Sequence, residues 1–299
     1  MTLARFRTAG PLALIFLIGA FALFRGGAGG PRPSDIDTAG PLRILSLSPN
    51  LTEILFALGL GDRVVGVTDY CRFPPEAREK PKVGALLNPS LERMFALEPN
   101  LIVLLPAHGG IGDRMAARGL RTLILPNDTV GDIFASIDSI GRATGSEEAA
   151  RVLADSLRNA LGEVTADPPD RVRRVMIVVS RTEGSVKDVF VAGPGTYLDE
   201  LLRRAGGENV FGRSAARYPE PSVEEILHKN PEVILEIRPE GDGAAAETRL
   251  ARGTWGTLPG LAAVERGNVF VLTGDHLVVP GPRMGETLRD IAAALREAR

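Results

Sequence analysis

Imidazole and thiol groups, which act as bases, nucleophiles or metal ligands, are few in this sequence of 299 residues: the histidines are His108, His228 and His276, and the one cysteine is Cys71. The histidines lack the H-x-x-x-H or H-x-H spacing that prebuilds a metal site. No G-x-x-x-x-G-K-[ST] phosphate loop and no G-x-S-x-G nucleophile turn occurs. We therefore expect neither catalysis nor a resident cofactor or metal. A metal site assembled from His108, His276 and Asp275 is the alternative.

Two glutamates hold matching positions in an internal repeat. Pro89–Leu104 aligns without a gap with Pro221–Glu236. Each copy opens with Pro-Ser-x-Glu, continues as a short helix, and ends with a proline and an apolar strand. Glu92 and Glu224 thus fall in a first helical turn, where a negative charge gains about 0.3 to 1 kcal/mol from the helix dipole.

Composition and charge exclude one class of partner. The chain has 35 Lys and Arg against 37 Asp and Glu, a formal net charge of −2. Binding to a nucleic-acid backbone needs a basic surface, so we expect no nucleic-acid partner. The length is sufficient for two lobes, each with its own core.

The first 30 residues have the pattern of an export signal. Arg5 and Arg7 precede an apolar run from Pro11 to Phe24, which is shorter than the roughly 20 residues of a membrane span. We predict export to the periplasm by a signal peptide. Arg25 directly follows the run, and the expected cleavage junction near Gly26–Gly30 lacks a clean A-x-A site, so an uncleaved membrane tether remains the alternative.

From Leu42 onward, short apolar runs alternate with amphipathic segments, a pattern typical of α/β units on a mostly parallel sheet. In the first part we expect strands at 43–47, 64–67, 101–105 and 122–125, and a helix at 52–60. In the last part we expect strands at 174–179, 233–237 and 268–272, and helices at 197–205, 223–229 and 284–297.

Between these parts lie two helical stretches with apolar residues three or four apart. Ser146 is the expected N-cap of the second, which contains no Pro or Gly up to Leu161. About 20 residues at about 1.5 Å each would make a rod of about 30 Å. We predict an α/β fold of two Rossmann-like lobes joined by one long rigid helix. The boundaries are 1–30 for the signal or anchor, 42–126 and 170–299 for the lobes, and 127–169 for the helical connector.

Three segments of the sequence resemble a known family: Ser46-Leu-Ser-Pro-Asn-Leu-Thr-Glu53, Val65-Gly-Val-Thr-Asp-Tyr-Cys-Arg-Phe-Pro-Pro75 and the repeat. The resemblance is to the cobalamin-binding, BtuF-type periplasmic proteins, and it continues at Ala205–Phe211 and Gly281-Pro-Arg283. These substrate-binding proteins of ABC transporters, which are related to iron-siderophore receptors, hold a ligand between two lobes. The resemblance implies a noncovalent binding protein, not an enzyme.

The resemblance also implies partners. In this family one glutamate on each lobe docks onto arginines of the transporter's membrane subunits, and these glutamates fall on Glu92 and Glu224. We expect the chain to meet a membrane only through its N-terminal segment or through that ABC importer.

Family ligand contacts fall on Tyr70, Leu86, Phe190, Tyr218, Asp275 and His276. Aromatic walls suit a flat macrocycle, and we predict a corrinoid, with cobalamin as the leading candidate. Cobalamin-binding relatives carry tryptophans at Leu86 and Tyr218, however, and the single tryptophan, Trp255, matches neither position. Haem or a ferric siderophore, with Tyr70 or His276 ligating iron, therefore remains open, as does a membrane-tethered sensor with the same lobes.

Overall fold

A computed structural model describes residues 41–165, 170–240 and 244–299. The chain divides into two compact units. The N-terminal unit extends to Arg158 and includes Val279–Pro282; the C-terminal unit comprises Asn159–Val278 and Arg283–Arg299. The predicted export segment lies outside the described residues. Within the described ranges, no helix is both long and apolar enough to cross a membrane.

The sheet of the N-terminal unit has four parallel strands in the order β2-β1-β3-β4. These are β1 (Ile44–Ser46), β2 (Val64–Val67), β3 (Leu101–Leu104) and β4 (Arg121–Ile124). Every residue of β1 and β3 is buried, as expected for a parallel sheet covered on both faces.

The α-helices of this unit are α2 (Pro49–Ala57), α3 (Leu91–Ala96), α4 (Gly110–Ala116) and α5 (Val130–Thr144), with short 3-10 turns η2 (Gly61–Arg63), η3 (Pro75–Glu79) and η4 (Pro106–His108). The predicted boundaries of α2 were wrong by three residues. The helix begins at Pro49 because proline suits a first turn whose N–H groups have no helical partner. It ends before Gly59, which has a φ of +75°.

Helix α6 (Glu147–Thr165) is one unbroken element of 19 residues, and the boundary between the units falls inside it. It begins directly after Ser146, the expected N-cap. Four exposed side chains form ion pairs one turn apart along it, between Glu148, Arg151, Asp155 and Arg158. Such pairs add a few tenths of a kcal/mol each to an exposed helix.

The C-terminal unit repeats this design. Its strands are β5 (Arg173–Ser180), β6 (Phe190–Val191), β7 (Gly207–Asn209), β8 (Val233–Arg238) and β9 (Val269–Thr273). Strands β7, β5, β8 and β9 pair in parallel, and only β6 is antiparallel, on the second half of β5. The prediction of two α/β lobes with mostly parallel sheets is confirmed.

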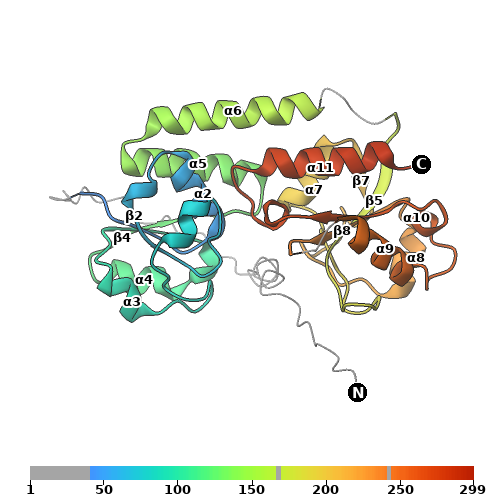
Figure 1. Cartoon of the computed structure of the whole chain (residues 1–299), viewed down its shortest axis with the longest axis horizontal. Helices are drawn as coiled ribbons and strands as arrows, with labels where there is room; N and C mark the ends of the chain where they lie inside the picture. Colours follow the sequence, from blue (N-terminus) through green and yellow to red (C-terminus); the bar gives the residue numbers. More distant parts are fainter. Residues whose placement is uncertain (1–40, 166–169, 241–243) are drawn as a thin grey trace, which may run out of the picture. The chain divides into compact units, whose positions relative to one another are not determined.

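The helices of the C-terminal unit are α7 (Tyr197–Arg204), α8 (Val223–Lys229), α9 (Ala244–Trp255), α10 (Ala262–Glu265) and α11 (Met284–Glu297), with a 3-10 turn η5 (Asp275–Val278). Helices α8 and α9 cover one face of the sheet, whereas α7 and α11 pack on the other (Figure 1). The first face encloses an apolar core around Trp255, Phe211 and Ile234.

The internal repeat is a structural repeat. Ser90 caps α3 and Ser222 caps α8, each hydroxyl accepting from the backbone N–H three residues on. The strands that follow, β3 and β8, occupy the same place in the two sheets, between β1 and β4 and between β5 and β9. Equivalent sequence segments therefore build equivalent positions in the two units.

A buried carboxylate organises the carboxyl ends of β5 and β8. Glu236 Oε2 accepts hydrogen bonds from Arg181 Nε at 2.9 Å and from Trp255 Nε1 at 3.0 Å, and Arg238 forms an ion pair with Oε1. Arg181 also donates to the carbonyls of Thr182 and Ser185. A buried charge needs such partners, and here they also fix the loop that leads to β6.

Strand β6 pairs on its other side with the segment 217–219. Val191 N–H donates to Pro219 O at 3.0 Å, and Gly193 N–H donates to Arg217 O at 2.7 Å, so this segment runs antiparallel to β6. The approach is close at Gly193, where a Cβ would lie only 2.6 Å from the carbonyl oxygen of Ala216. Glycine is required here because a side chain would push the segment away.

Replacing Trp255 with Phe tests the buried carboxylate. The change removes one of the donors to Glu236, so the free energy of unfolding should fall by about 1 to 3 kcal/mol. Urea unfolding followed by circular dichroism measures it without the tryptophan signal. Leu250→Ala, at an exposed site of the same helix, is the control and should shift stability by less than about 0.5 kcal/mol. Equal stability of W255F and wild type would contradict this role.

Replacing Gly193 with Ala tests the close approach. We expect stability to fall by about 1 to 3 kcal/mol, because overpacking forces the backbone to move. Gly253→Ala is a matched control with the opposite sign. Gly253 is in α9, and a Cβ there would contact nothing within 4 Å, so alanine should raise stability by about 0.5 to 1 kcal/mol. Thermal unfolding measures the stability of both variants. A G193A protein as stable as G253A would refute the steric argument.

Candidate functional site

The predicted ligand contacts divide between the two units, at the edges where parallel strands end. Tyr70 follows β2 in the N-terminal unit, and Asp275 and His276 follow β9 in the C-terminal unit. In open α/β sheets, ligands bind outside the carboxyl ends of the strands because the connecting loops gather there.

In the N-terminal unit, Tyr70 and Leu86 lie on neighbouring segments. Asp69 N–H donates to Gly84 O at 3.0 Å, which joins the two loops just before these residues. Tyr70 is half-buried, whereas Leu86 is only 3% exposed. Leu87, which was not a predicted contact, is 44% exposed. The accessible apolar side chain of this loop is therefore Leu87.

The motif Ser46–Glu53 builds the start of α2. Thr52 Oγ1 lies within hydrogen-bond distance of Ser46 Oγ, at 2.8 Å, and of Cys71 Sγ, at 3.1 Å, and Ser48 Oγ donates to Asn50 Oδ1. Burial raises the pKa of the Cys71 thiol, which keeps it protonated and unreactive. These polar groups are buried and partner one another, so the motif here positions the backbone.

His108 lies at the end of β3, in η4. Leu105 N–H donates to its Nδ1 at 3.0 Å, and its Nε2 is buried without a hydrogen-bond partner in the described chain. Burial lowers the pKa of the imidazole, although backbone groups of Leu105, Leu86 and Leu47 oppose the shift. The ring is therefore neutral at pH 7. Across the described ranges, no group of three or more His, Cys, Asp or Glu side chains is arranged to hold a metal ion.

In the C-terminal unit, the structure brings Phe190 and Tyr218 together. The antiparallel pairing of β6 with segment 217–219 sets these residues diagonally across from each other. Because side chains alternate between faces along paired strands, both lie on the same face. Both are half-buried. They place two aromatic side chains on one face beside the carboxyl end of β5.

The predicted contact residues Asp275 and His276 each pair with a side chain of the same unit. Asp275 Oδ1 accepts from Arg283 Nη1 at 2.6 Å, and His276 Nε2 is 2.7 Å from Asp290 Oδ2. Asp290 had no predicted role, and Arg283 entered the prediction only as part of the motif Gly281-Pro-Arg283. Iron ligation by His276 Nε2 would require breaking the bond to Asp290.

Glu92 and Glu224 are exposed in the first turns of α3 and α8. The pKa of Glu224 is lowered by its own backbone N–H and by the Ser222 hydroxyl, so the carboxylate stays charged in mildly acidic solution. Neighbouring His228 is exposed near the end of α8.

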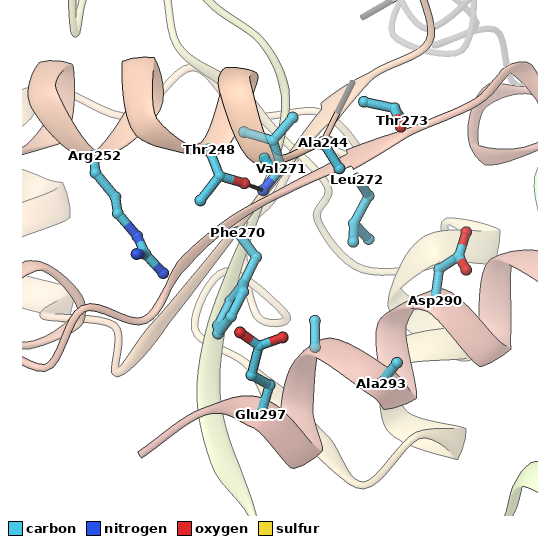
Figure 2. A pocket seen from close by; sticks show the side chains of 12 residues that line it. Ala244, Thr248, Arg252, Phe270, Val271, Leu272, Thr273, Asp290, Ala293 and Glu297 are labelled. Carbon is cyan, nitrogen blue, oxygen red and sulfur yellow. Dashed lines mark hydrogen bonds between the residues drawn. The ribbon is translucent and has the colours of Figure 1, made fainter. Parts of the chain in front are cut away.

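A pocket of about 530 Å³ lies elsewhere in the C-terminal unit, between α9, β9 and α11. Figure 2 shows Thr248 and Arg252 on α9, across β9 from Asp290 and Glu297 on α11. Strand β9 is the edge of its sheet, and α9 covers part of that edge: Thr248 Oγ1 accepts from Val271 N–H and Arg252 Nε donates to Val269 O. Of the predicted contact residues, none lines this pocket.

Comparison with known proteins identifies relatives along most of the chain. A vitamin B12-binding protein of Vibrio cholerae is 28% identical over 261 residues, which cover 86% of this chain and 90% of that protein. The crystal structure of the V. cholerae vitamin B12-binding protein BtuF has a TM-score of 0.70 at 27% identity, covering 85% of this chain and 96% of that one.

The fold is shared with proteins of other specificity. The haem-binding protein HutB of V. cholerae has a TM-score of 0.74 at 22% identity, covering 85% of this chain and 98% of that one. The family model described as periplasmic binding protein matches residues 44–275. The members of this family bind substrates and are not enzymes. This chain therefore belongs to the periplasmic binding protein family.

Proposed function

We propose that the chain is an exported binding protein that captures a corrinoid, with cobalamin as the leading candidate, and delivers it to an ABC importer. The observation that carries this proposal is the aromatic pair Phe190 and Tyr218, on one face at the carboxyl end of β5. Two rings on one face can cover the apolar face of a large macrocycle, and the phenol can meet a polar substituent. Relatives named as vitamin B12-binding proteins support the same ligand class.

Haem is the second candidate, and two observations favour it. Solved haem-binding proteins share the fold, and the tryptophans that the resemblance to cobalamin-binding proteins leads us to expect are replaced by Leu86 and Tyr218. Because His276 Nε2 is bonded to Asp290, the phenol of Tyr70 is the stronger candidate for an iron ligand.

A two-arm binding experiment separates these ligands. We expect purified protein to retain cyanocobalamin through a desalting column, and Phe190→Ala to weaken binding about tenfold or more, since about 1.4 kcal/mol of lost contact is tenfold in affinity. Leu250→Ala, exposed in the same unit, is the control. In the other arm, haemin is added and its Soret band is recorded for wild type and for Tyr70→Phe. A Soret shift that Y70F abolishes, with no retained cobalamin, would replace the corrinoid by haem.

We further propose that Glu92 and Glu224 dock the loaded protein onto the importer. Two carboxylates at equivalent helix starts in the two units suit a receptor with a repeated basic site. Exposed ion pairs add little affinity but fix orientation.

The combined Glu92→Ala and Glu224→Ala variant should bind the ligand as wild type does, yet lose most uptake in cells that depend on the imported ligand. Glu225→Ala is the matched control, because Glu225 is exposed in the same first turn of α8. Growth and uptake of labelled ligand measure the effect. Normal uptake by the double variant would refute docking and would favour a membrane-tethered sensor.

A further inference from the structure

The turn η5 is fastened to α11 by three side-chain contacts. The carboxylate of Asp275 pairs with Arg283, which directly precedes α11. The ring of His276 bonds to Asp290, and Thr287 Oγ1 donates to the His276 carbonyl at 3.0 Å. From the same face of the sheet, the hydroxyl of Tyr197 on α7 donates to the carbonyl of Leu277.

The imidazole of His276 is confined on two sides. Its Nε2 meets Asp290, and its Cε1–Nδ1 edge lies against Gly274, where a Cβ would be 2.4 Å from Cε1 and 2.6 Å from Nδ1. Gly274 has a φ of +128°, a backbone conformation that favours glycine. The ring can occupy this place only because residue 274 has no side chain.

Exposure differs sharply between the two neighbours on η5. The side chain of His276 is 13% exposed, whereas that of Asp275 is 35% exposed. Asp275 is thus the accessible polar group of the turn, and His276 is turned toward α11. Asp290, its partner, lies on α11 at the wall of the pocket seen in Figure 2.

We infer that His276 and Asp290 are positioning residues, which hold η5 so that Asp275 is presented at the carboxyl edge of the sheet for the ligand. The inference rests on the proposed function for the ligand that Asp275 meets. It differs from the sequence prediction, which placed His276 itself in contact with the ligand. A turn that is already ordered binds a ligand more tightly, because no conformational entropy is lost in ordering it during binding.

Three variants of α11 test the inference. Asp290→Ala removes the partner of His276, and Asp290→Asn keeps an oxygen that accepts from Nε2–H. Glu286→Ala, at an exposed site of the same helix, is the control. Hydrogen exchange of the amides of 275–278 is measured without ligand, and the dissociation constant is measured for cyanocobalamin, or for haemin if only haemin binds.

We expect D290A to speed exchange in 275–278 at least tenfold and to weaken binding about tenfold, with D290N and E286A close to wild type in both. Unchanged exchange and affinity in D290A would overturn the inference, as would a lower melting temperature with unchanged affinity. Because exchange is read without ligand, the two proposals fail separately. If the wild-type protein binds neither cyanocobalamin nor haemin, the proposed function is contradicted. If amide exchange at 275–278 in D290A is as slow as in wild type, the inference that Asp290 holds η5 in place is contradicted.

Discussion

In both units the core strands run parallel, and this direction determines where polar side chains can gather. Parallel strands must be joined by crossovers, so each loop that follows a strand emerges at the same edge of its sheet. Tyr70 after β2, His108 after β3 and Asp275 after β9 are placed at such edges by chain direction alone. The helices that precede β3 and β8 also start at these edges, which brings Glu92 and Glu224 to the same ends of their units.

Two carboxylates of the C-terminal unit, one in its interior and one at the edge of its sheet, differ in their burial and in their number of partners. Glu236 is almost completely buried, and its carboxylate pairs with Arg181 directly after β5, with Arg238 on β8 and with Trp255 on α9. Removing one partner from such a group leaves a buried charge underbonded, which costs more than the pair contributes. Asp275 keeps one pairing, to Arg283, and remains partly exposed. The first carboxylate is enclosed by its partners, whereas the second keeps part of its surface in contact with solvent.

The aromatic surface depends on close backbone packing. Phe190 and Tyr218 share a face because segment 217–219 lies against β6, and that approach requires the missing side chain of Gly193. Strand β6 is itself fixed by the loop that Arg181 ties to Glu236. The placement of these two rings thus relies on the buried network behind them, and a proposed ligand would meet groups that are already in position.

The sequence by itself determined the elements whose signals are local. Helix α8 was predicted at its observed bounds because Ser222 begins it and Asn230, in the left-handed conformation, ends it. Helix α9 was missed, since Gly253 interrupts its interior and only Ala251 and Trp255 among its described residues are buried, which leaves too narrow an apolar face to detect in the sequence. Strand β7 was missed because three residues become a strand only by pairing with β5. Only the tertiary structure decided the orientation of His276, since its partner lies 14 residues away on another helix. The imidazole of His276 turns toward the Asp290 carboxylate because the packing of α11 beside η5 brings this acceptor within hydrogen-bond distance.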